Sequence, residues 1–143
     1  ELAMRSLPHG PEFRFVDRLL QLTPGKTGVG EYTVRGDEHF FAGQPPEEAT
    51  MPGVLMAEAA AQVAGLVVQE DPANPRWPRL KLAALRAVNI LGVVRPGNTL
   101  RIEANIIAVL GDIIQARASA SVAGVEVFAT EVTLSGVESV KTA

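Results

Sequence analysis

The sequence predicts an α+β domain in which one antiparallel sheet curls around a single apolar helix. Three observations support this prediction. Residues 53–69 have the composition of a long helix and are apolar on nearly every side. Two strand patterns precede this stretch, and four follow it. A sheet that buries the helix under its inner face and exposes a polar outer face accounts for all of these features.

Length and composition favour one domain over residues 1–143. The apolar content of 47% is enough for a core, and a net charge of −3 argues against a nucleic-acid binder. No apolar run is long enough to span a membrane, and no secretory signal is visible. We therefore expect a cytoplasmic protein. Met4 is a candidate natural start, which would make residues 1–3 an added remnant.

Metal and redox sites are not expected. The chain has no cysteine, so disulfides and thiolate ligands are excluded. Its two histidines, His9 and His39, are too few for a typical zinc site. We predict neither a metal nor a cofactor.

The loop-rich first third contains two expected strands. Residues 13–22 and 27–35 have strand patterns, and Pro24-Gly25-Lys26 is the turn between them. The helix at 53–69 follows, rich in alanine, leucine and methionine. Pro52 suits its first turn, and Thr50 is the expected cap.

The helix carries one polar stripe on its otherwise apolar surface. Steps of four, three and four place Glu58, Gln62, Gly65 and Gln69 on one side. A carboxylate inside an apolar helix is costly unless it is paired, so such a group is seldom kept without a function. Glu58 is therefore the main candidate for chemistry.

Beyond the helix the apolar period changes from helical to two. After a Pro-rich loop in which we interpret Trp77 as an anchor, strands are expected at 80–94, 100–110, 114–122 and 125–134, with turns at Gly111-Asp112 and Ala123-Gly124. The alternation slips near Phe128, which indicates a bulge. Antiparallel strands joined by hairpins form a meander.

These elements resemble the hot-dog fold and, more narrowly, the beta-hydroxyacyl-[acyl carrier protein] dehydratases of fatty-acid synthesis. The matching motifs are Leu7-Pro8-His9, Phe13-x-Phe15-Val16-Asp17-Arg18, Phe40-Phe41-x-Gly43, Met51-Pro52-Gly53-Val54-Leu55-Met56-x-Glu58-Ala59, Ala61-Gln62-x-Ala64-Gly65-Leu66 and Pro96-Gly97. The resemblance implies five to six antiparallel strands around one long helix. It also implies a dimer, or a trimer of dimers, that accepts acyl-CoA or acyl-[acyl carrier protein].

The resemblance also implies the site residues. Glu58 would serve the departing hydroxyl of the substrate, and Gln44 lies where the family keeps its catalytic histidine. Gly53 would offer a backbone N–H to the thioester oxygen, with Val54 and Gln62 also on the substrate side. In the family the two catalytic groups usually come from opposite subunits.

The glutamine leaves three functions open. A primary amide is not a general base, so a dehydratase activity would be weakened. A second possibility is a thioesterase in which Glu58 activates water while Gln44 and Gly53 orient the thioester. The third is a non-catalytic acyl-binding or partner subunit.

Overall fold

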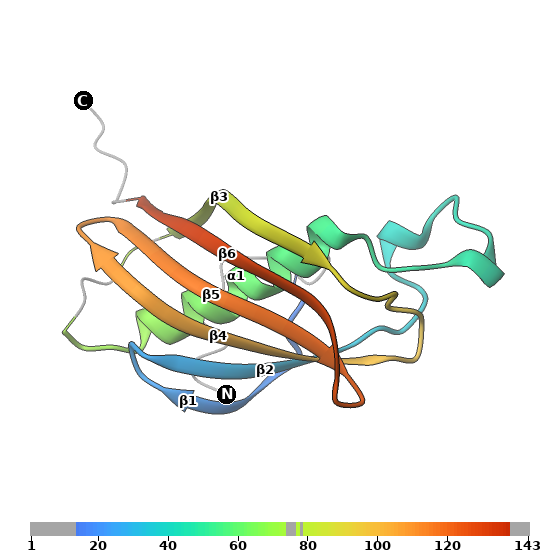
Figure 1. Cartoon of the computed structure of the whole chain (residues 1–143), viewed down its shortest axis with the longest axis horizontal. Coiled ribbons are helices and arrows are strands. Elements are labelled where there is room, and N and C mark those ends of the chain that lie inside the picture. The colour runs from blue at the N-terminus through green and yellow to red at the C-terminus, as the bar shows by residue number, and fades with distance from the viewer. Residues whose placement is uncertain (1–13, 74–76, 78, 138–143) are drawn as a thin grey trace.

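The computed structural model describes residues 14–73, 77 and 79–137, which form one long helix packed on a six-stranded antiparallel sheet. Figure 1 shows the sheet in front of the helix. In chain order the elements are β1 (Arg18–Thr23), β2 (Thr27–Thr33), the short 3₁₀ helices η3 (His39–Phe41) and η4 (Pro46–Glu48), α1 (Gly53–Gln69), β3 (Arg79–Ile90), β4 (Thr99–Leu110), β5 (Ile113–Val122) and β6 (Val125–Val137). The predicted fold class is confirmed. Residues 1–3, His9 and Phe13 lie outside the described residues.

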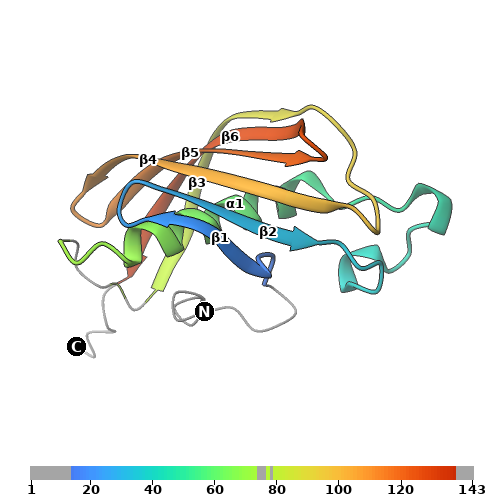
Figure 2. The ribbon, with the colours of Figure 1, turned by 90° about the horizontal axis from the view of Figure 1, so that it is seen from below.

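The strand order across the sheet is β1-β2-β4-β5-β6-β3, and every neighbouring pair is antiparallel. Strands β4, β5 and β6 form the predicted meander. Strand β3 precedes β4 in the chain but crosses over to pair with β6 (Figures 1 and 2). The sheet therefore has β1 at one edge and β3 at the other.

The turns and the bulge lie where the sequence places them. Gly25 (φ 75°) turns β1 into β2, and Ala123 (φ 51°) and Gly124 (φ 81°) turn β5 into β6. Ala120 pairs with Phe128 while Ser121 pairs with Glu126, so β6 holds one extra residue beside Phe128. The predicted bulge is confirmed.

The helix spans the predicted residues, but its cap is different. Pro52 is the N-cap residue, and no side chain caps the helix. The prediction that Thr50 caps α1 is wrong, because Thr50 lies two residues before the N-cap position, where its backbone is bonded to Gln44. Strand β3 ends at Ile90 rather than at residue 94, because Leu91 and Gly92 both donate to the single carbonyl of Val127.

Small residues let the helix lie close to the sheet. The inner face of β5 presents alanines at 116, 118 and 120, all buried. A Cβ on Gly30 of β2 would lie 2.8 Å from Val63 Cγ2, and one on Gly28 would collide with Val67. Strand β2 therefore packs against α1 at a distance that only glycine permits.

Trp77 anchors the loop after the helix, as predicted. It is 4% exposed, and its indole Nε1 donates to Asp112 Oδ1 at 3.0 Å. The side-chain amide of Gln69 bonds both the N–H and the carbonyl of Trp77. The end of α1 is thereby tied to the β4–β5 turn.

Candidate active site

Glu58 is the one charged residue between Gly53 and Gln69, and its side chain is half-buried. The Nε2 group of Gln62, one turn further along α1, lies 3.5 Å from Glu58 Oε1. Residues four apart share a helix face, so the sequence predicted this pair. The carboxylate lies on a helix whose other residues from Met56 to Val68 are buried.

Gln62 is 2% exposed, and its amide has one possible orientation. The backbone N–H of Phe15 donates to Gln62 Oε1 at 2.8 Å. Because an N–H is only a donor, the oxygen must face Phe15, which leaves the Nε2 donor facing Glu58. A fixed amide therefore holds the carboxylate. Phe15 lies in one of the motifs that match the family, but no sequence pattern shows that its backbone N–H orients Gln62.

Gly53, which is half-buried, and Val54, which is exposed, form the start of α1. The first intrahelical bonds run from Leu55 and Met56 to the carbonyl of Pro52, so the N–H groups of Gly53 and Val54 precede the helical ladder. The helix dipole makes this end suitable for developing negative charge on an oxygen.

Gln44 closes a projecting segment, residues 42–50, which we call the flap. Its Nε2 donates to the carbonyls of Phe40 (3.0 Å) and Thr50 (3.1 Å), and its Oε1 accepts the N–H of Thr50 (2.9 Å). Both donors and one acceptor site of the amide are therefore used by the backbone. Figures 1 and 2 show the flap extending beyond the end of the sheet.

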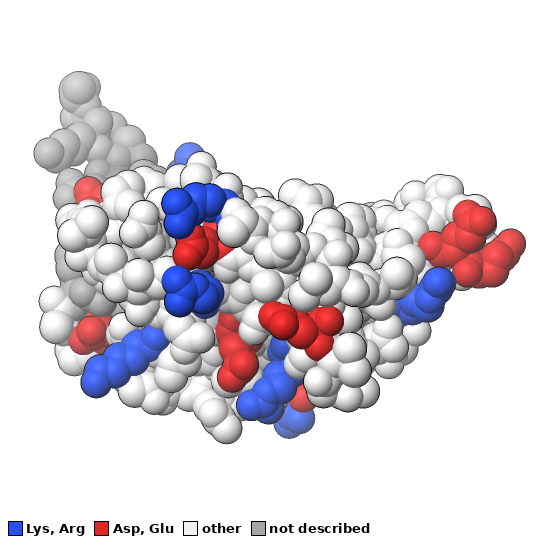
Figure 3. Space-filling model, viewed as in Figure 1, with Lys and Arg blue, Asp and Glu red and all other residues white. Residues whose placement is uncertain are grey.

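Two further contacts hold the flap. Arg95 Nη1 donates to the carbonyl of Glu47 at 3.3 Å, and the N–H of Met51 donates to the carbonyl of Val94 at 2.8 Å. Glu47 and Glu48 are exposed at the tip. Figure 3 shows the acidic atoms gathered at this end of the molecule.

One aromatic contact joins the residue that bonds Gln44 to the residue that bonds Gln62. The rings of Phe40 and Phe15 lie 6.1 Å apart, edge to face. The carbonyl of Phe40 binds Gln44, and the N–H of Phe15 binds Gln62. The structure thus brings Glu58 and Gln62 into contact and links Gln44 to them through two phenylalanines.

A separate cluster fixes the turn before the flap. The hydroxyl of Tyr32 donates to Glu38 Oε2 at 2.6 Å, and the N–H groups of Arg35 and Gly36 donate to the same carboxylate. Burial opposes the charged form of Glu38, but these hydrogen bonds outweigh it and lower its pKa. Burial is the main cause of the raised pKa of Tyr32, and the neighbouring Glu38 raises it further. The cluster is structural, and sequence spacing did not reveal it.

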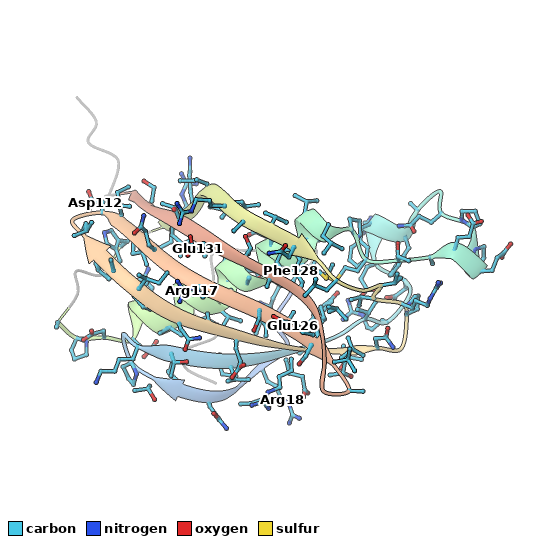
Figure 4. All side chains as sticks on the ribbon, in the orientation of Figure 1. Arg18, Asp112, Arg117, Glu126, Phe128 and Glu131 are labelled. Carbon is cyan, nitrogen blue, oxygen red and sulfur yellow. The ribbon has the colours of Figure 1, made fainter. Side chains whose placement is uncertain are left out.

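The outer face of the sheet has a shallow hollow of about 370 Å³ lined partly by Asn105, Arg117, Ser119 and Glu131. Arg117 and Glu131 form an ion pair there at 3.2 Å (Figure 4). The hollow includes none of the predicted site residues. We do not take this hollow as the candidate site, because the carboxylate of Glu58 and its oriented amide lie elsewhere.

Among the described residues, no group of three or more His, Asp or Glu side chains is arranged to hold a metal ion. Within that same part of the chain, no helix is long and apolar enough to cross a membrane.

The family follows from comparison with known proteins. Residues 7–131 match the model described as the FabA-like domain. The chain belongs to this family. It is 38% identical to the 3-hydroxyacyl-[acyl-carrier-protein] dehydratase FabZ of Geobacillus thermodenitrificans, over 87% of this chain and 86% of that one. It is also 38% identical to FabZ of Bacillus cytotoxicus, over 89% and 88%.

Solved structures of low identity share the hot-dog fold. The Dehydratase Heterocomplex ApeI:P from Xenorhabdus doucetiae has a TM-score of 0.80 at 18% identity, covering 95% of this chain and 91% of that one. A hypothetical thioesterase with coenzyme A from Streptococcus pneumoniae has a TM-score of 0.64 at 14% identity, covering 85% and 88%. At these identities the likeness shows the fold alone.

Proposed function

We propose that this FabA-like protein binds 3-hydroxyacyl and 2-enoyl thioesters beside α1 and is a weak dehydratase when alone. Glu58 carries the proposal, because it is a single carboxylate on an apolar helix and an anchored amide orients it. Acyl-CoA and acyl-[acyl carrier protein] are the proposed substrates. As in the resembled family, we expect the chain to work as a dimer.

The reaction removes a proton from the α carbon, forms the double bond and expels the β-hydroxyl as water. Glu58 in its protonated form would donate to the departing hydroxyl. The N–H of Gly53, with Val54 beside it, would bind the thioester oxygen as negative charge develops there. The α proton needs a separate base.

Gln44 is proposed to occupy the position of the family's histidine, fourteen residues before the helix carboxylate. Its amide does not accept a proton near neutral pH, and its bonds to Phe40 and Thr50 hold it on the flap backbone. Loss of one acid–base group typically costs about 10²–10⁴-fold in rate. The isolated chain is therefore expected to be slow.

Thioester hydrolysis is the second candidate, since the oriented carboxylate of Glu58 is also suited to activating water. The contacts of Gln44 weigh against it, because a thioester carbonyl would have to compete with the backbone carbonyls of Phe40 and Thr50 for the two N–H donors of the amide. The third candidate function is binding of acyl thioesters without catalysis. It requires only α1 and the residues at its start, Gly53 and Val54.

One set of assays separates the three. Ultraviolet absorbance follows hydration of crotonyl-CoA and dehydration of 3-hydroxybutyryl-CoA, and thiol release follows hydrolysis. We expect Gln44→His to raise hydration by about tenfold or more, and Glu58→Gln in that background to remove the gain. Glu70→Gln, the same change at the other end of α1, is the matched control and should have no effect.

The outcomes differ for each candidate. Thiol release that depends on Glu58 would establish the hydrolase. Binding of crotonyl-CoA with neither reaction would establish the non-catalytic subunit. Absence of binding to the wild-type protein would refute the proposed function altogether.

A further inference from the structure

We infer that Arg14 is a specificity residue of the acyl site, and that this chain takes thioesters whose acyl chain ends in a carboxylate. The inference rests on the proposed function and names the class of acyl chain that the site would accept. Two features of the described residues carry it: a buried guanidinium nitrogen without a hydrogen-bond partner, and the position of its residue beside the amide that holds Glu58.

The side chain of Arg14 has a hydrogen-bond donor that the described structure leaves unused. Among the described residues, Arg14 Nε is the one buried side-chain nitrogen or oxygen atom without a hydrogen-bond partner. A guanidinium always carries its charge, so hiding one of its N–H groups from water without a partner costs free energy. Buried polar groups in folded proteins are nearly always bonded. The unbonded donor therefore calls for an acceptor from outside the described chain.

The shape of the guanidinium limits which acceptor fits. The group is planar, and its Nε–H lies beside an Nη–H on the same edge of a rigid fork. A carboxylate accepts from both N–H groups at once through its two oxygens, and this paired, charge-assisted contact is among the strongest that arginine makes. Arg14 as a whole is half-buried, so the side chain is not sealed off from a ligand. A terminal carboxylate is the acceptor that matches best.

Arg14 lies next to the amide that orients Glu58. The nitrogen of Phe15, which donates to Gln62 Oε1 at 2.8 Å, is bonded to the carbonyl carbon of Arg14. Standard bond lengths place the Arg14 Cα about 2.4 Å from that nitrogen. The Nε2 group of the same amide lies 3.5 Å from Glu58 Oε1. A short series of contacts thus runs from Arg14 to the carboxylate that would serve the β-hydroxyl.

The acyl chain would extend from Glu58 toward Arg14. The thioester oxygen is proposed to bind at Gly53 and the β-hydroxyl at Glu58, so the carbons beyond the β carbon continue along α1 toward Gln62. Gln62 is one turn past Glu58, about 6 Å along the axis at about 1.5 Å per residue. An acyl chain of medium length would therefore bring its end group near Arg14.

The unbonded donor also discriminates between acyl chains. A hydrocarbon end would cover the guanidinium with methyl and methylene groups, which offer no acceptor, and the cost of the buried donor would remain. A terminal carboxylate removes that cost and adds the paired contact. Selectivity then comes both from the favoured ligand and from the penalty on its competitor.

A pair of matched ligands tests the inference. The compounds 7-carboxyhept-2-enoyl-CoA and 2-octenoyl-CoA have the same number of carbons and differ in the terminal carboxylate. We expect the wild type to bind the carboxylate ester at least about tenfold more tightly, as measured by isothermal titration calorimetry. Arg14→Leu should lose this preference and keep its affinity for 2-octenoyl-CoA. Arg14→Lys retains the charge without the fork and should fall between the two.

A second arginine and a second measurement serve as controls. Arg18 is an exposed arginine at the start of β1, bonded to Glu31 at 3.0 Å, and Arg18→Leu should keep both wild-type affinities. Thermal melting without ligand separates a binding role from a structural one. Because Arg14→Leu removes a donor that the fold does not use, it should not lower the melting temperature.

Each other result overturns the inference. It fails if the wild type binds the two esters equally or prefers 2-octenoyl-CoA, if the preference survives in Arg14→Leu, or if Arg18→Leu loses it too. A lower melting temperature or failure to fold in Arg14→Leu would show that the arginine is structural. Binding of 2-octenoyl-CoA without any preference for the carboxylate would leave the proposed function standing, whereas binding of neither ester would refute both.

Discussion

The two edge strands of the sheet, β1 and β3, differ in how open they are to pairing with another chain. Strand β1 is six residues long, is broken by a register shift between Leu19 and Gln21, and begins with Arg18 paired to Glu31. Strand β3 is twice as long and exposes an apolar row along its second half. Short, bulged and charged edges discourage pairing with other chains, whereas long apolar edges favour it. The difference predicts that β3, rather than β1, is the edge at which a strand of another chain would pair.

The largest expected effect is on association of the isolated chain. Strand β3 is the surface through which copies of the chain should meet at high concentration. Leu85→Asp should weaken this association by about a hundredfold or more, because burying an unpaired carboxylate costs several kcal/mol. Sedimentation velocity over a concentration series measures the change. Equal effects of Leu85→Asp and Leu20→Asp would show that the edges do not differ.

The second effect contrasts the packing of α1 near each edge. Gly30→Ala in β2 places its Cβ 2.8 Å from Val63 and 3.1 Å from Val16, so it should destabilise the fold by about 1–3 kcal/mol. Gly65→Ala in α1 meets only Leu80 of β3, at 3.6 Å, and should stabilise by about 0.5–1 kcal/mol. Urea denaturation measures both. If Gly65→Ala destabilised the fold more than Gly30→Ala, the packing of α1 would be tighter on the β3 side than on the β2 side.

The third effect concerns the flap, which lies near the β3 edge. Gln44→Ala removes three hydrogen bonds worth about 1 kcal/mol each at most. We expect faster amide hydrogen exchange at residues 47–50 and little change in β1 and β2. Gln21→Ala, an exposed glutamine on β1, is the control. Unchanged exchange in the flap would show that Gln44 does not hold it.

The smallest effect is a pH dependence at the end of β2. The pKa of Glu38 is lowered in the folded state. The ionised Glu38 therefore stabilises the fold at pH values above its ordinary pKa of 4.5, and this stabilisation is lost as the pH falls through the lower pKa of the folded state. Wild type should exceed Glu38→Gln in stability above that pH, by less than about 1 kcal/mol after solvent screening. Melting temperatures across this range measure the difference, which should shrink in acid.

Local patterns predicted most of the fold. The composition of residues 53–69 gave the helix its bounds, and period-two alternation located β4, β5 and the bulge beside Phe128. The cap at Thr50 and the end of β3 were wrong. The N-cap residue is Pro52 rather than Thr50, which capping preferences do not predict. The end of β3 depends on contacts with Val127, a distant residue that local alternation does not contain.

The sequence predicted only part of the candidate site. Glu58 and Gln62 are four residues apart on one helix, so their contact follows from helical geometry. The bonds of the Gln44 amide lie within residues 40–50, but they depend on how the flap folds back, which alternation and capping preferences do not predict. The exposure of β3 follows from a crossover that places it beyond β6, which no short sequence window contains.

Ile90 packs on Gly53, so one side chain belongs both to the β3 edge and to the proposed acyl entrance at the start of α1. If docking on β3 alters how a thioester binds at the start of α1, thermodynamic linkage requires the thioester to alter docking by the same factor. Substrate would then act as an assembly signal, and the fraction of paired chains would report the supply of acyl groups.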